Sequence, residues 1–160
     1  MTFPNPVNDV ATRLTASVVA TIGAVALVFG QRWLVALLAY GFVARALCGP
    51  RFSPLALLVT RVVVPRLPFS VRPVAGPPKR FAQAIGAVVT LSATVCWFGF
   101  GLGGATDVLV AMLVAFAFLE AAFGLCVGCK IFGVGMRLGL VPPEVCAECE
   151  NIWLRLPAQP

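Results

Sequence analysis

Two Cys-x-x-Cys pairs are the residues of this 160-residue sequence whose type and spacing most directly indicate chemistry. Cys126 and Cys129 form the first pair, Cys146 and Cys149 form the second, and sixteen residues separate the pairs. This C-x2-C-x16-C-x2-C spacing is typical of four-thiolate zinc sites, so one hypothesis is a zinc ion bound by all four cysteines. Such a zinc would hold the C-terminal tail against the membrane helix that precedes it.

Thiol–disulfide or sulfur-transfer chemistry at Cys126 and Cys129 is the second hypothesis. A C-x-x-C pair can close a disulfide, and a lowered pKa makes one of its thiols a nucleophile. Lys130 next to Cys129 favours a thiolate, whereas the C-terminal end of a helix, where we expect this pair, disfavours an anion. A third interpretation is that the cysteines are small apolar residues that fill the interior.

Glu120 is an acidic residue inside an apolar stretch, and such a residue needs a partner. It lies twelve residues after Val108, which is about 18 Å along a helix, and Arg45 lies equally far from Trp33 in an earlier apolar stretch. We therefore predict an ion pair between Arg45 and Glu120 within the membrane. The pair could simply fix the helix register, or Arg45 could face a substrate at a gate or anion site.

The remaining cysteines differ in predicted depth. The same arithmetic places Cys48 near Cys126 and Cys129, where it could act as a resolving thiol for a mixed disulfide. Cys96 is expected near the opposite face of the membrane, where it is interpreted as a packing residue.

The elements that must position these residues are membrane helices. Hydrophobic residues make up 60% of the chain and charged residues only 11%, against about 25% charged in soluble domains. The net charge of +6 is better explained by loops held on the cytoplasmic side than by nucleic-acid binding, and we expect no nucleic-acid partner. The absence of histidine excludes histidine-based catalysis and histidine metal ligands.

Four apolar stretches predict an all-α membrane protein, a four-transmembrane-helix bundle. We also expect a short interfacial helix at about 55–64 in the middle cytoplasmic loop, and an extended, proline-rich connection after it. The predicted domains are a four-span membrane domain, 1–136, and a short cytoplasmic C-terminal tail, 137–160. The predicted spans are approximately 10–29, 33–48, 81–102 and 108–127, the last reaching as far as 136.

Basic residues predict the orientation of the bundle. Seven of the twelve Lys and Arg residues lie within residues 45–80, whereas the link between the third and fourth stretches has none. The positive-inside rule then places the middle loop and both termini in the cytoplasm, with the lipid bilayer of a bacterial inner membrane around the bundle. The N-terminus lacks a basic n-region, so we expect the first apolar stretch to be retained as a span.

Several segments together resemble a known family. They are residues 7–13 (VNDVATR), 45–46 (RA), 49–54 (GPRFSP), 78–82 (PKRFA), 119–124 (LEAAFG) and 126–131 (CVGCKI). Jointly they resemble a bacterial family of small membrane proteins catalogued as domain of unknown function 4395, over roughly residues 7–132. The resemblance implies membership but no activity, and the tail pair Cys146 and Cys149 lies outside the family pattern. Members resemble proteins found beside sulfurtransferases and thioredoxin-like proteins, which favours thiol or sulfur chemistry.

Three functional hypotheses follow, and the sequence leaves open whether the protein is an enzyme. The first is a membrane thiol protein in which Cys126 and Cys129 relay electrons or sulfur with a thioredoxin-like or rhodanese-like cytoplasmic partner. The second is a transporter or channel subunit for a small anion or sulfur compound, with Arg45 and Glu120 along the path. Four short spans are few for a transporter, so this hypothesis requires a homo-oligomer. The third is a non-enzymatic assembly protein with a structural zinc tail.

Overall fold

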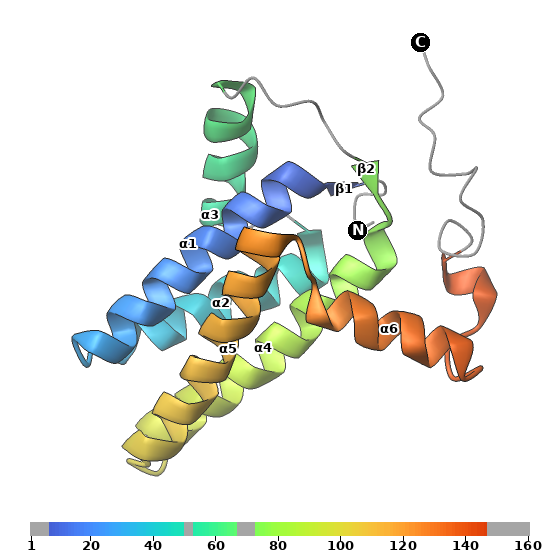
Figure 1. Cartoon of the computed structure of the whole chain (residues 1–160). Helices are drawn as coiled ribbons and strands as arrows, with labels where there is room; N and C mark the ends of the chain where they lie inside the picture. Colours follow the sequence, from blue (N-terminus) through green and yellow to red (C-terminus); the bar gives the residue numbers. More distant parts are fainter. Residues whose placement is uncertain (1–6, 50–52, 67–72, 147–160) are drawn as a thin grey trace.

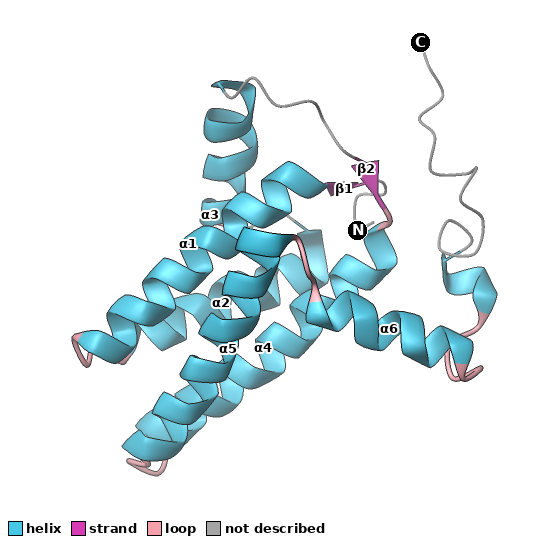
Figure 2. Ribbon diagram, in the orientation of Figure 1, coloured by secondary structure: helices cyan, strands magenta, loops and turns pink. Residues whose placement is uncertain are grey.

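The computed structural model describes residues 7–49, 53–66 and 73–146, and within these residues the protein is almost entirely helical (Figures 1 and 2). Two short strands, β1 (Val7–Asn8) and β2 (Pro73–Val74), pair antiparallel. The six α-helices are α1 (Asp9–Val28), α2 (Trp33–Cys48), α3 (Pro54–Leu58), α4 (Gly76–Phe98), α5 (Gly103–Phe123) and α6 (Val127–Arg137). The prediction of an all-α protein is therefore confirmed.

Three of these helices, α1, α4 and α5, are long and apolar enough to cross a membrane. The helix α2 is apolar but has only sixteen residues, which is about 24 Å of helix. The helices α1 and α2 follow each other through a short turn at residues 29–32, and α4 and α5 through a turn at residues 99–102. We call this side of the bundle the turn end. The opposite side, where α1 and α4 begin and α2 and α5 end, is called the thiol end.

The four long helices pack as a ring in which α1 lies against α5, α5 against α4, and α4 against α2. Small residues allow close approach between helices, as is usual in membrane bundles. A methyl group added at Gly86 of α4 would overlap the ring of Phe42 of α2. The buried clusters that hold the ring together comprise Val19, Leu38, Phe42, Ala87, Leu113 and Ala117, and Ala26, Val35, Ala93 and Val110.

Large apolar side chains cover the outside of the bundle. Val88, Val108 and Phe118 are each more than half exposed, whereas Thr90 and Thr106 are almost fully buried. The buried hydroxyls donate to main-chain carbonyls, as Thr106 does to Ala93 (3.2 Å). A surface of this composition suits lipid rather than water.

The start of α4 differs from the sequence prediction. We expected an extended connection through Pro77 and Pro78 and a span from residue 81, but α4 already begins at Gly76. Proline is tolerated in the first turn of a helix, because the N–H that it lacks has no partner there in any case. The first turn of α4 therefore includes Lys79, which the prediction had placed in a loop.

The end of the last span also differs. The prediction continued it to residue 127 or beyond, but α5 ends at Phe123, where Gly124 adopts a left-handed conformation (φ 68°). The helix α6 then starts in a new direction and leaves the bundle across the first turns of α4 (Figure 1). At the crossing, a methyl group on Gly128 would lie 2.6 Å from the Cβ atom of Ala82.

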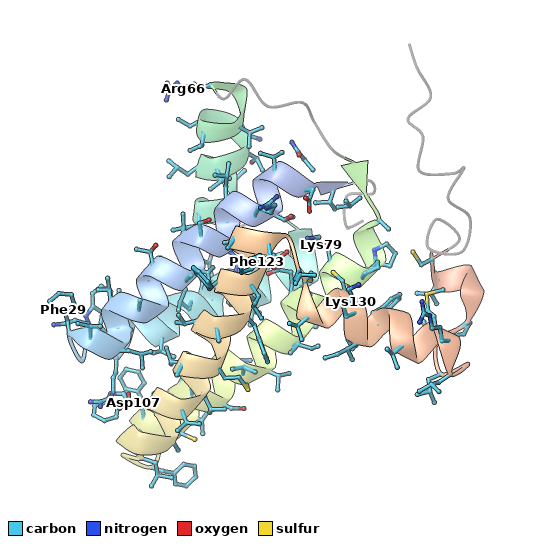
Figure 3. The ribbon with its side chains drawn as sticks, viewed as in Figure 1. Phe29, Arg66, Lys79, Asp107, Phe123 and Lys130 are labelled. Atoms are coloured by element: carbon cyan, nitrogen blue, oxygen red, sulfur yellow. The ribbon has the colours of Figure 1, made fainter. Side chains whose placement is uncertain are left out.

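The predicted short helix in the middle loop is present. It begins as α3, with Ser53 accepting a hydrogen bond from the main chain of Ala56 (3.4 Å), and continues through a π-helical turn (Val59–Val63) and a 3-10 turn (Val64–Arg66). Ala56 and Val59 are buried, and Arg66 ends the helix at the top of Figure 3. Its location at a membrane surface stays a prediction.

Candidate functional site

The first Cys-x-x-Cys pair opens a helix rather than closing one. Cys126 is the N-cap of α6, and its Sγ atom accepts a hydrogen bond from the main-chain N–H of Cys129 (3.4 Å). An N-cap side chain normally accepts from the N2 or N3 residue, and the C-x-x-C spacing places Cys129 at N3. The expectation that the pair lies at a helix C-terminus is therefore wrong. The N-terminal end of a helix carries partial positive charge and favours an anion.

The two thiols of this pair are in direct contact. The Sγ atom of Cys129 donates to the Sγ atom of Cys126 at 2.7 Å, whereas a disulfide would bring the sulfurs to about 2.05 Å. The hydrogen bond from the Cys129 thiol is the main cause that lowers the pKa of Cys126. The Cys129 N–H and the charge of Lys79 lower it further, against burial and Glu120, which raise it.

The thiol of Cys129 shifts in the opposite direction. Its hydrogen bond to Cys126 is the largest cause that raises the pKa of Cys129, and burial adds to this effect. The two thiols of the pair therefore differ, and Cys126 loses its proton more readily than Cys129.

Lys79 is the central cation of the thiol end, and sequence reasoning missed it. Its side chain is only 8% exposed, and its Nζ atom lies 2.7 Å from Glu120 Oε1 and 3.4 Å from Asp9 Oδ1. It also donates to the hydroxyl of Thr12 (3.2 Å). The first turns of α1 and α4 and the last turn of α5 therefore meet at one ammonium group, which is labelled in Figure 3.

The predicted Arg45–Glu120 pair is not formed, since Glu120 pairs with Lys79 instead. Arg45 is buried, donates to Gln83 Oε1 (2.9 Å) and to Ser53 Oγ (3.5 Å), and stacks over the ring of Phe42. Arg45 and Glu120 nevertheless lie near one another, because both line the cavity described below. In the ring of helices, however, α5 has α4 rather than α2 as its neighbour, so Lys79 reaches Glu120 first.

A cavity of about 90 Å³ lies between these helices, and both Cys126 and Arg45 line it. The polar residues of its lining include Thr12, Thr15, Arg45, Gln83 and Glu120, together with the thiol residue Cys126. The apolar residues of the lining include Val19, Phe42, Met112, Leu113 and Phe116. A space of this size and mixed lining has room for several water molecules or a ligand of a few atoms.

Two arginines close the helix ends around this cavity. Arg13 donates to the main-chain carbonyls of Ala121 (3.1 Å) and Ala122 (2.9 Å) in the last turn of α5. Arg80 donates to the carbonyl of Ala46 (3.0 Å) near the end of α2. Carbonyls in the last turn have no partner within the helix, so these contacts supply a donor to three of them.

The other cysteines take different places. Cys48 ends α2 and is not among the residues that line the cavity, and Cys96 lies in the last turns of α4 near the turn end. Cys146 is disulfide-bonded and buried, in a 3-10 turn (Pro143–Cys146) that follows α6 in the chain and contacts α4. Cys149 lies outside the described residues. Those residues contain no group of three or more side chains that could hold a metal ion, and a four-thiolate zinc site would require Cys146 to be reduced.

Comparison with known proteins identifies the family. Residues 7–137 match the family model described as a domain of unknown function (DUF4395), so this chain belongs to that family, and the resemblance seen in the sequence is confirmed. Searches of curated proteins and of solved structures found no match. The match ends at the last residue of α6, so it includes the thiol end and α6 but leaves out Cys146 and Cys149.

Proposed function

We propose that this protein is a membrane thiol protein in which Cys126 is the nucleophile and Cys129 is the resolving thiol. The observation that carries the proposal is the capping geometry, in which Cys126 accepts hydrogen bonds from both the N–H and the thiol of Cys129. Helix N-termini and nearby cations are the environments in which cysteines become reactive thiolates. The contact between the two sulfurs means that little motion is needed to close a disulfide.

The membrane placement that we propose has four spans, with α2 as the short one, and the thiol end in the cytoplasm of a bacterial inner membrane. The length and composition of α1, α4 and α5 support three spans, and the return of α2 along α4 supports a fourth. Seven of the twelve Lys and Arg residues lie within 45–80, which begins and ends at the thiol end. By the positive-inside rule this charge supports a cytoplasmic thiol end.

The reaction that fits the pair is thiol–disulfide exchange with a thioredoxin-like cytoplasmic partner. The Cys126 thiolate attacks one sulfur of the partner's disulfide, which forms a mixed disulfide and releases the partner's other sulfur as a thiolate. Cys129 then attacks the Cys126 sulfur, and its proton passes to the partner thiolate that leaves. The partner's disulfide is reduced to one thiol and one thiolate, and the thiolate takes a proton from water, while Cys126 and Cys129 are oxidised to a disulfide. The reverse sequence, with a reduced partner, restores the dithiol.

Lys79 and Glu120 have distinct roles in this proposal. The positive charge of Lys79 helps to hold Cys126 as a thiolate, as the lowered pKa of Cys126 indicates. Glu120 opposes the thiolate electrostatically, but its 2.7 Å contact holds the Lys79 ammonium at the thiol end. Both groups are positioning residues, because the sulfur atoms alone exchange electrons.

Trapping of the mixed disulfide tests this function. Cys129→Ser leaves the first attack intact and removes the resolving thiol, so we expect it to accumulate a covalent adduct with a thioredoxin-like protein on non-reducing gels. Cys126→Ser should abolish the adduct, and Cys96→Ser, a change near the turn end, should leave trapping unchanged. An adduct that persists when Cys126 is replaced would contradict the proposed nucleophile.

A second candidate function is supported by the cavity. Arg45 lines it, and the side chains of the described residues that accept its hydrogen bonds, Gln83 and Ser53, are both neutral, although the charge of Glu120 also acts on it. A buried guanidinium with neutral partners can bind a small anion, including a sulfur oxyanion, in an oligomeric transporter or channel. Uptake of a labelled sulfur oxyanion into proteoliposomes should fall in Arg45→Ala and Glu120→Ala. Uptake that survives both changes would eliminate this function.

A further inference from the structure

The helix α6 has one face that the protein covers. Phe132 is buried, and its ring packs against that of Phe81 of α4 with the centroids 5.6 Å apart. On the same side, Gly128 approaches Ala82 so closely that even a methyl group would not fit. The contact with α4 thus fixes the rotation of α6 about its own axis.

A second face of α6 is apolar and uncovered by the described residues. Ile131, Val134 and Leu138 are 50%, 52% and 68% exposed, and they recur at the i, i+3 and i+7 positions that form one stripe on a helix. Leu140 extends the exposed apolar surface beyond the helix end. For these large side chains, exposure to water would be unfavourable, so the stripe needs an apolar occupant.

Basic side chains flank this stripe. Lys130 and Arg137 are both exposed and lie seven residues apart, which places them on one side of the helix next to the apolar stripe. Residues 121–143 contain no Asp or Glu. The side of α6 that the described residues leave uncovered therefore combines an apolar stripe with positive charge and no negative charge.

The direction of α6 matches a membrane surface. It begins at the thiol end and runs across the first turns of α4, at a steep angle to the candidate spans (Figure 1). A helix that lies across the end of a membrane bundle runs along the plane of the interface. An apolar stripe with a basic flank is the composition of helices that rest in this plane on anionic lipid.

We propose that α6 lies in the headgroup–acyl boundary of the bilayer. Its apolar stripe inserts between acyl chains, and Lys130 and Arg137 bind the anionic headgroups of phospholipids. Cys126 caps this helix, so the lipid surface fixes the depth of the thiol and leaves it at the membrane boundary. The proposal rests on the membrane placement above and is independent of the thiol chemistry.

Tryptophan quenching in vesicles tests the proposal. In full-length protein with Trp33, Trp97 and Trp153 changed to Phe, single tryptophans are introduced as Val134→Trp on the stripe and as Gly133→Trp on a different face. A Cβ atom at position 133 meets no atom within 4 Å, so the introduced side chain starts in open space. Vesicles of phosphatidylcholine and phosphatidylglycerol carry bromine at carbons near the headgroup.

We expect strong quenching at position 134 and weak quenching at position 133. Equal, weak quenching at both positions would overturn the proposal and show that the stripe faces water, a soluble partner or a second copy of the chain. Val88→Trp, on the exposed surface of α4 near the middle of the helix, reports separately on the spans in vesicles whose bromine lies near the ends of the acyl chains. If it is not quenched either, the membrane placement itself is wrong, whereas quenching there alone contradicts only the inference about α6.

Charge selectivity gives the second readout. Bromine carried on phosphatidylglycerol should quench the tryptophan at position 134 more than bromine carried on phosphatidylcholine. Lys130→Gln combined with Arg137→Gln should remove this preference, because each basic residue near an anionic surface contributes roughly fivefold in affinity. A preference that is unchanged in the double variant would overturn the assignment of these two residues to the headgroups.

Discussion

The two ends of the bundle are both held by ion pairs, but only one of them is buried. At the turn end, Arg32 pairs with Asp107 at 2.9 Å, with side chains that are 27% and 42% exposed. At the thiol end, Lys79 pairs with Glu120 at 2.7 Å with side chains that are 8% and 17% exposed. An exposed pair contributes little, whereas a buried ammonium is costly unless carboxylates surround it. Packing of the helices does not by itself require a buried charge, yet the thiol end holds one, the Lys79 ammonium.

The cysteines of the two ends differ in the same way. Cys96, near the turn end, is a half-buried residue within the last turns of a helix. Cys126 caps the start of a helix, accepts two hydrogen bonds from Cys129, and lies within the field of Lys79. The comparison shows that position on a helix, rather than residue type, separates a packing cysteine from a candidate nucleophile.

Removal of the buried cation should have the largest effect. Lys79→Met leaves Glu120 and Asp9 without their ammonium, and breaking a buried pair costs about 3–5 kcal/mol. We expect a large loss of thermal stability in detergent, measured by circular dichroism. Combining it with Glu120→Gln should recover part of the loss. No stability change in the single variant would mean that Lys79 is not paired as described.

Disruption of the crossing of α6 should have an intermediate effect. Gly128→Val places a branched side chain against Ala82, and overpacking of this kind costs about 1–3 kcal/mol. Gly133→Ala is the matched control, because a methyl group there meets open space and helix propensity improves by up to about 1 kcal/mol. The thermal midpoint should fall for the first variant and hold or rise for the second. Equal midpoints would contradict the close contact of α6 with α4.

The exposed pair at the turn end should give the smallest effect. Arg32→Gln removes the salt bridge to Asp107 and the stacking of the guanidinium on Trp97, both at the surface. We expect a small loss of thermal stability that disappears at high salt, because exposed charges are screened. A loss as large as that of Lys79→Met would remove the distinction between the two ends.

Prediction from the sequence succeeded where hydrophobicity alone decides the structure. The apolar runs identified the helical regions of α1, α2, α4 and α5, since a membrane helix needs a long apolar stretch. The predicted boundaries failed at Pro77, Pro78 and Gly124. Prolines at a helix start and a glycine at a helix end fit either a loop or a helix boundary, and only packing decides between them.

The thiol end was predicted in part for a similar reason. Counting residues gives the depth of a side chain but not which helix lies beside it, so Glu120 was assigned to Arg45 rather than to Lys79. Lys79 could have been found through the PKRFA segment, had Pro78 and the preceding Pro77 been interpreted as a helix start. The Cys126–Cys129 pair was singled out from its spacing, but the dipole at the pair was assigned the wrong sign because Gly124 ends α5 before it.

The pH dependence of cysteine alkylation tests the central claim most directly. Iodoacetamide reacts with thiolates, and labelling at each cysteine can be followed by mass spectrometry from pH 5 to 10. Because the pKa of Cys126 is lowered, chiefly by the hydrogen bond from Cys129, we expect Lys79→Met and Cys129→Ala both to move its labelling profile to higher pH. A labelling profile of Cys126 that neither substitution moves would contradict this role of Cys129 and Lys79.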